Sequence, residues 1–517
     1  MGRLLMIGIV AWVTALGWPV RAQVHNAEAV IPPMCYTKTE GRHNPCYVCH
    51  QTYHDKRPNQ MDDGNLQGEY AFSEVGVHNH WTNLFEDRSA GIAAQSDGEI
   101  MTYVGQDNYA ALAGNLRALG WKGWIPDLKG LAQGRAAFDE TGLARDGSGW
   151  VAFNYIPLPS TFWPSNGATD DVMIRLPKAF RLDEDGKFSR HVTFANLGLL
   201  EASFQEWNSV SVPPIDEAHV GVDLNGDGVL GMTDRVVARS HYVGAAKKEP
   251  VARMLYPQGT EFLHSVRYVG LEGNRVVIPP RMKELRYMRK MRFLSMPKLA
   301  SIYGNEVQEK LDEQLPRWSP VLTSAGYEKS AMGWQVLGFI EDKDGALRPQ
   351  TYEEHGFCMG CHSTIGTSID QTFAFPRKVA GAKGWGYMDL AGLKDRPSRG
   401  ETEGEILTYF KRVGGGSEFR ENGEIAARWF DANGKVKENA VRDADVASLI
   451  TPSPERARLL NKAYRTIVWD QDFIHGRDPN LAPATNVYRD IDPATTQPLR
   501  PEFRHQWDIR LDWREGM

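Results

Sequence analysis

Apolar residues recur at helical spacing mainly toward the two ends of the chain. A leucine repeat predicts a helix over 110–119. Three further helices are predicted over 305–315, 405–413 and 454–468. The last of these opens with Ser453 before a proline and an acid, which is the usual chemistry of a helix N-terminus. These segments indicate that both ends of the chain carry helices.

The middle of the chain has shorter apolar runs separated by turn residues. The run 172–176 is typical of a buried strand. Glycine-containing turns at 273–274 and 344–345 predict hairpins over 264–278 and 334–347. The middle therefore predicts a β-rich region.

The N-terminus has the pattern of a secretory signal. Arg3 precedes an apolar stretch over 4–18, and small residues allow cleavage before Gln23. An uncleaved anchor is the alternative, but the stretch is shorter than the ~20 residues of a spanning helix. We therefore expect an exported protein, periplasmic or secreted, with no membrane span after cleavage.

Length and charge narrow the function classes. A chain of 517 residues is long enough for two or three domains or one large fused one. Its formal net charge is −6, and loss of Arg3 and Arg21 with the signal would make it −8. This mild acidity argues against nucleic acid as a partner.

Four of the five cysteines lie in two copies of the pattern Cys-x-x-Cys-His. The copies are Cys46 to His50 and Cys358 to His362. The pattern is typical of covalent haem c attachment, in which the thiols bond to the porphyrin and the imidazole binds the iron. A redox dithiol or a zinc site built from both cysteine pairs is the alternative, but neither explains the two histidines.

On these motifs the chain resembles the di-haem c-type cytochromes, with a more distant resemblance to di-haem peroxidases. The resemblance implies two covalent haem c groups, bound through Cys46, Cys49, Cys358 and Cys361. It implies iron ligation by the motif histidines, His50 and His362. Combined with the element pattern, it predicts an α+β fold with helical haem c segments at both ends and a β-rich middle. The expected boundaries are a signal at 1–22 and segments at 23–124, 125–349 and 350–517.

A short acidic loop in the middle region has the ligand spacing of an EF-hand calcium site. Oxygen ligands would come from side chains at positions 1, 3, 5 and 12 and from a backbone carbonyl at position 7. These positions are Asp223, Asn225, Asp227, Asp234 and Val229. The final aspartate departs from the EF-hand glutamate and resembles the calcium loops of dockerin modules. A metal-free turn is the alternative.

The residues opposite the haem histidines would decide the iron chemistry. His78, His80 and His475 are candidates for distal iron ligands. Cys35 stands outside both motifs and could be a buried thiol, a reactive thiol, an intermolecular pairing site or an iron ligand.

Two functions follow from the cytochrome resemblance. The first is electron transfer between periplasmic or membrane-associated redox proteins. The second is an oxidoreductase of the peroxidase or oxygenase type, with one haem open to a ligand. A structural protein that carries haem is a third class, which would leave two redox centres without a purpose.

Overall fold

The structure is a computed structural model of the whole chain. It describes residues 26, 30–53, 61–70, 72–312, 328–329, 333–362, 365–414 and 422–513. The predicted signal at 1–22 lies outside these residues.

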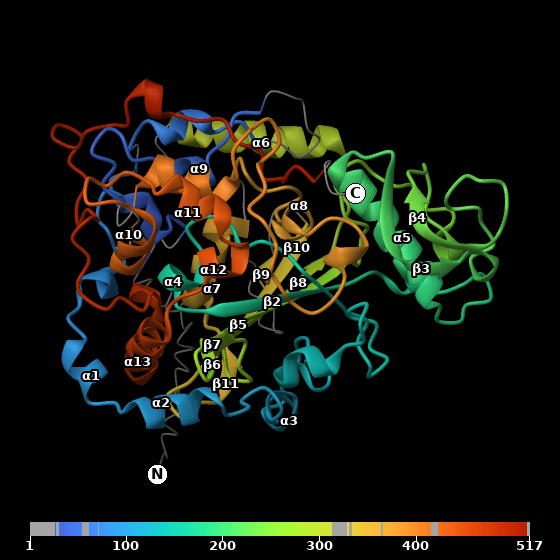
Figure 1. The fold of residues 1–517 in the computed structure, drawn as a ribbon, viewed down its shortest axis with the longest axis horizontal. Coiled ribbons are helices and arrows are strands. Elements are labelled where there is room, and N and C mark those ends of the chain that lie inside the picture. Colours follow the sequence, from blue (N-terminus) through green and yellow to red (C-terminus); the bar gives the residue numbers. More distant parts are fainter. Residues whose placement is uncertain are drawn as a thin grey trace, which may run out of the picture.

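One seven-stranded antiparallel sheet forms the centre of the molecule (Figure 1). Its strand order is β1-β2-β5-β8-β10-β11, and the short β9 also pairs with β10. The strands are β1 (Val151–Phe153), β2 (Thr169–Arg175), β5 (Glu261–Arg267), β8 (Met282–Lys290), β9 (Glu328–Lys329), β10 (Trp334–Glu341) and β11 (Leu347–Pro349).

Two small hairpins stand apart from this sheet. Strands β3 (Ser209–Asp216) and β4 (Met232–Val237) pair with each other, as do β6 (Gly270–Glu272) and β7 (Arg275–Val277). In Figure 1, β3 and β4 project to one side together with α5 (Arg190–Gln205). The acidic loop 223–234 belongs to this projecting part, between β3 and β4.

Helices occur along the whole described chain. The N-terminal ones are short, and α1 and α2 contact the long C-terminal helix α13. The helix that carries the second cysteine motif, α7, follows directly after β11. Besides α5, the helices are α1 (Ser89–Ala93), α2 (Asp97–Val104), α3 (Leu112–Ala118), α4 (Trp163–Asn166), α6 (Met296–Leu311), α7 (Tyr352–His362), α8 (Ala374–Arg377), α9 (Glu405–Val413), α10 (Gly423–Trp429), α11 (Glu438–Asp443), α12 (Val446–Ile450) and α13 (Pro454–Asp470).

The central strands are buried on both faces, and they carry charged residues into the interior. Arg267 of β5 forms an ion pair of 2.9 Å with Asp171 of β2, and both side chains are almost fully buried. Glu341 of β10 forms a similar buried pair with Arg281, just before β8. Removing one partner of such a pair leaves a buried charge without compensation, which is strongly destabilising.

Several predicted elements are confirmed. The helix over 405–413 matches α9, and α13 begins at Pro454 with Ser453 accepting a hydrogen bond from the Arg456 N–H. The turn at 344–345 joins β10 to β11 as expected. The predicted hairpin over 264–278 differs, because β5 ends at Arg267 and pairs with β2 and β8, while only β6 and β7 form a hairpin.

The predicted fold class is wrong. The structure mixes helices with a sheet-rich core, and α4 and α5 lie within the region expected to be β-rich. The helix predicted over 305–315 in that region overlaps α6, which begins earlier, at Met296, and ends at Leu311. The first segment consists largely of short 3-10 turns and loops rather than a helical unit. Long-range packing onto the sheet, rather than local helix propensity, organises these end segments.

The buried pair of Glu201 and Lys378 gives a test of this packing. Glu201 on α5 lies 2.9 Å from Lys378, and both side chains are at most 1% exposed. We expect Lys378→Met to lower the free energy of unfolding by about 3–5 kcal/mol, since Glu201 would stay buried and unpaired. Chemical denaturation of the wild type and the variant measures this loss.

Two controls accompany that variant. Lys247→Met removes an exposed partner of Glu184 and should cost less than about 1 kcal/mol. The double variant Glu201→Gln/Lys378→Met should be more stable than Lys378→Met alone. A single variant as stable as the wild type would show that the pair does not hold α5 to this segment.

Candidate functional site

The two Cys-x-x-Cys-His motifs adopt different local structures. The first lies in a 3-10 turn over Cys46–Val48, and the N–H groups of Cys49 and His50 both bond to the Cys46 carbonyl. The second forms the last turn of α7 and ends at His362. In both cases one turn of backbone presents two sulfurs and an imidazole on neighbouring positions.

The structure brings the two motifs together, although Cys46 and Cys358 are 312 positions apart in the chain. The Thr367 N–H donates to the Cys49 carbonyl at 3.0 Å. The Thr367 hydroxyl lies 2.7 Å from the Val48 carbonyl and 2.9 Å from that of Cys49. The loop after the second motif is thus bonded directly to the backbone of the first.

His50 is oriented by a buried carboxylate. Its Nδ1 lies 3.0 Å from Oδ2 of Asp63, whose side chain is 1% exposed. The same oxygen accepts the Gly366 N–H at 3.0 Å, and Oδ1 accepts the Gln51 N–H at 2.8 Å. With Nδ1 engaged in this way, Nε2 is the nitrogen left to bind a metal.

His362 is oriented by a backbone carbonyl instead. Its Nδ1 lies 2.9 Å from the Gln371 oxygen. Asp370 and Gln371 both have positive φ, 49° and 59°, a conformation that costs non-glycine residues energy. The buried carboxylate of Asp370 offsets that cost, because it pairs with Lys290 and accepts the Tyr256 N–H at 2.9 Å.

Three of the four motif thiols have a raised pKa. Burial raises the pKa of Cys46 to about 12 and also raises the pKa of Cys49 and Cys361. Cys361 and Cys35 lie close enough to Cys49 to raise its pKa further. All five cysteines are in described segments and none forms a disulfide. This environment does not suit a redox dithiol, which needs a lowered thiol pKa.

Direct coordination of a metal ion by both cysteine pairs is not supported either. Within the described residues, no group of three or more His, Cys, Asp or Glu side chains is placed to hold a metal ion. The zinc alternative for the motifs therefore lacks the converging ligands that it requires.

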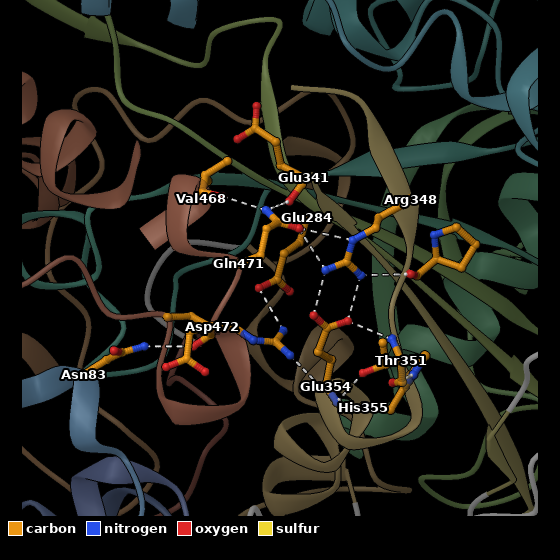
Figure 2. A network of polar contacts seen from close by, with 12 residues as sticks. Asn83, Glu284, Glu341, Arg348, Thr351, Glu354, His355, Val468, Gln471 and Asp472 are labelled. Carbon is orange, nitrogen blue, oxygen red and sulfur yellow. Dashed lines mark hydrogen bonds and ion pairs between the residues drawn. The ribbon is translucent and has the colours of Figure 1, made fainter. Parts of the chain in front are cut away.

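A polar network anchors the start of α7 (Figure 2). Arg348 forms two hydrogen bonds of 2.8 Å with the Glu354 carboxylate and also bonds to Gln471 at the end of α13. Glu354 in turn accepts the Thr351 N–H at 2.7 Å, and the Thr351 hydroxyl accepts the Glu354 N–H. This reciprocal capping fixes the helix whose last turn carries the second motif.

The sheet supplies further groups to the second motif that the sequence did not single out. His264, Arg286 and Gly338 lie side by side on β5, β8 and β10. Burial lowers the pKa of His362 to about 4, the bond to Gln371 opposes this, and Arg286 and His264 lower it further. Cross-strand register is invisible in one sequence, so no motif marked these residues.

Two of the three predicted distal ligands pair with a carboxylate. Nδ1 of His78 lies 2.7 Å from Asp490, and Nδ1 of His475 lies 2.7 Å from Asp472. His80 precedes Trp81, whose ring packs edge-on against Phe357 of α7 at 5.5 Å. The strip around His80 thus borders the helix of the second motif. An iron-binding role for these histidines stays a prediction.

A polar cleft lies beside the first motif. It has a volume of about 590 Å³ and is lined by Thr52 and Tyr53, which follow the motif, and by Trp207 and Trp507. Its arginines are engaged with protein groups, since Arg510 pairs with both Glu206 and Asp508. The cleft lining does not include the motif cysteines or His50.

The acidic loop has the backbone turns of an EF-hand loop. Asp223 accepts the N–H groups of Gly226 and Gly228, and Asp227 accepts that of Val229. Asn225 accepts the Asp227 N–H. Asp234, the expected twelfth ligand, is exposed on β4. Calcium binding by this loop stays a prediction.

Comparison with known proteins gives a family. The model of a family described as "-like lipoprotein" matches residues 19–447. An uncharacterized lipoprotein of Aquifex aeolicus (strain VF5) is 31% identical over 515 residues, with 88% of this chain and 86% of the relative covered. No solved structure matches.

These comparisons overturn the identification of the chain as a di-haem cytochrome. The matched family and relative are lipoproteins, and their descriptions do not name a redox role. Electron transfer and the alternative peroxidase or oxygenase activity were inferred from that identification, and both predictions are wrong. The chemistry of the two motifs is a separate question, because these descriptions do not name any ligand.

Among the described residues, every helix is too short or too polar to cross a bilayer.

The buried His355 of α7 predicts a pH dependence of stability. Its Nδ1 donates to the Thr351 carbonyl, its Nε2 accepts the Gly338 N–H, and burial lowers its pKa to about 4. An unfolded histidine has a pKa near 6.5, so the folded state favours the neutral imidazole of His355 more than the unfolded state does. The contribution of His355 to the free energy of unfolding is therefore complete above pH ~6.5 and is lost as the pH falls toward 4. We expect His355 to account for up to about 3 kcal/mol of the decrease in the free energy of unfolding over this pH range.

Urea denaturation between pH 7 and pH 4 tests this expectation. His355→Gln keeps a donor and an acceptor without the titration, so its stability should fall less steeply over this range. His241→Gln, at an exposed position, should follow the wild type. Equal slopes for all three proteins would contradict the assignment.

The calcium loop can be tested by thermal unfolding. We expect calcium to raise the Tm of the wild type relative to a chelator, because a bound ion stabilises the folded state alone. Asp223→Ala/Asp227→Ala should abolish the rise. Asp183→Ala/Asp185→Ala, in another acidic turn, should retain it. A wild-type Tm that is independent of calcium would contradict the prediction of a calcium site.

Proposed function

The chain belongs to the lipoprotein family that it matches over 19–447, and we propose that its functional site is the pair of adjoining Cys-x-x-Cys-His motifs, each holding one covalent haem c. The proposal concerns what the protein binds. It includes neither the electron-transfer role nor the peroxidase-type role.

The orientation of the two histidines carries the proposal. His50 and His362 are both tethered through Nδ1, to Asp63 and to the Gln371 carbonyl respectively. Each would therefore bind a haem iron through Nε2. When bound, haem would supply the iron, so a converging set of protein ligands is not needed.

The thiols fit the same cofactor. The site needs sulfurs that are not consumed in disulfides, and all four motif cysteines meet this condition. Haem attachment would add each S–H across a porphyrin vinyl group, with the sulfur on one carbon and the hydrogen on the other. The desolvation that raises the thiol pKa of Cys46 and Cys49 suits the uncharged thioether that would form. Arg286 lies beside Cys358 and Cys361 and is paired with Glu284 at 2.8 Å.

The description of the family as lipoproteins supports an exported protein. We propose the periplasm or the cell exterior as its compartment, which is supported by the signal-like pattern ahead of Gln23. We expected redox proteins as partners because of the electron-transfer role, and that expectation loses its basis together with the role. The exclusion of nucleic acid stays a prediction from the net charge.

Haem content tests the proposal. The full chain, produced in a bacterium that attaches haem c, should show two haems per chain by the pyridine haemochrome method. Haem staining after denaturing electrophoresis should show that they are covalent. Cys46→Ala/Cys49→Ala and Cys358→Ala/Cys361→Ala should each retain one haem.

Cys35→Ala is the matched control, since it removes a nearby cysteine outside both motifs, and it should retain two haems. A wild-type protein that folds without covalent haem in that host would contradict the proposal. Equal haem content in all variants would contradict the assignment to these cysteines.

A further inference from the structure

The two histidines differ in the charge of the group that holds Nδ1. His50 faces the carboxylate of Asp63 at 3.0 Å, whereas His362 faces a neutral carbonyl at 2.9 Å. The distances are nearly equal, so the difference lies in the acceptor and not in the length of the contact. A carboxylate acceptor makes an imidazole a stronger donor to a metal than a neutral acceptor does.

We propose that Asp63 is a positioning residue that strengthens His50 as a ligand and makes the first iron centre the one with the lower reduction potential. This rests on the proposed attachment of haem at both motifs. A more basic axial imidazole stabilises the more positive, oxidised iron, so the iron at His50 is the harder of the two to reduce.

Three hydrogen bonds hold the Asp63 carboxylate in position. The side chain is 1% exposed and accepts these bonds from His50, Gln51 and Gly366. Gly366 is needed for this contact, because a Cβ at that position would lie 2.1 Å from Oδ1 of Asp63.

The Gln371 carbonyl, which is the acceptor for His362, is also held in a defined position, but unlike a carboxylate it carries no charge. The turn Ile369–Thr372 closes with hydrogen bonds in both directions, 3.1 Å and 3.0 Å, between its first and last residues. Lys290 and the Tyr256 N–H hold Asp370 inside it. The turn therefore presents the Gln371 carbonyl to His362 in a defined position, and Asp370 does not face the imidazole as its acceptor.

Spectroelectrochemical titration of the haem-loaded full chain tests the proposal. The wild type should show two separate potentials. Asp63→Asn should raise the lower one and bring the two together, with at least a tenfold change in that reduction equilibrium, about 59 mV for one electron. Asp62→Asn changes the neighbouring carboxylate, which bonds to Thr52 and not to His50, and should leave both potentials unchanged.

A second variant keeps the test decisive if Asp63→Asn does not fold. Cys358→Ala/Cys361→Ala should leave only the first haem, and its potential should match the lower wild-type value. A match to the higher value would overturn the proposal, as would a single shared potential in the wild type. Absence of covalent haem would instead overturn the proposed function, and haem staining distinguishes that result.

Discussion

One buried carboxylate holds the candidate site together. Asp63 accepts hydrogen bonds from His50, from Gln51 and from Gly366, so it joins the first motif to the loop that follows the second. Thr367 completes the junction through the Cys49 carbonyl. The close approach leaves no room for a side chain at Gly366. The first motif and the loop after the second motif are thereby placed in one site, although most of the chain separates them. The sheet and α7 must be positioned so that the bonds of Asp63 and Thr367 can form.

The central sheet is held in place partly by ion pairs buried in its interior. Arg267 with Asp171, and Glu341 with Arg281, are ion pairs with almost no exposure. Burying charges costs more than burying apolar groups, and each pair is tolerated only when both partners are present and correctly aligned. The same arrangement anchors α7, since Arg348 and Glu354 connect its first turn to β11 and to the end of α13 (Figure 2).

The chain is a member of a lipoprotein family whose matched relative carries no stated activity. Its cysteine motifs nevertheless sit in a defined chemical setting, with two imidazoles tethered through Nδ1. The two tethers are unlike, a carboxylate for His50 and a carbonyl for His362. An asymmetric pair of sites can hold two copies of one cofactor with different properties, which a pair of identical sites cannot do.

The sequence alone determined the local features: the motif residues, the capping of α13 by Ser453, the extent of α9 and the turn between β10 and β11. These depend on neighbours within a few positions, so one chain is enough to predict them. The strand β8 was missed because its charged residues hide a buried strand, and the helices α4 and α5 were missed because packing overrides local propensity. Asp63 and Gln371 face His50 and His362 from only 13 and 9 positions away, but through irregular loops that have no periodic pattern in the sequence. Asp63 also accepts the Gly366 N–H from 303 positions away, and Arg286 approaches the second motif from the sheet. Only the tertiary structure decides such contacts, because neither an irregular turn nor a long-range hydrogen bond leaves a periodic trace in the sequence.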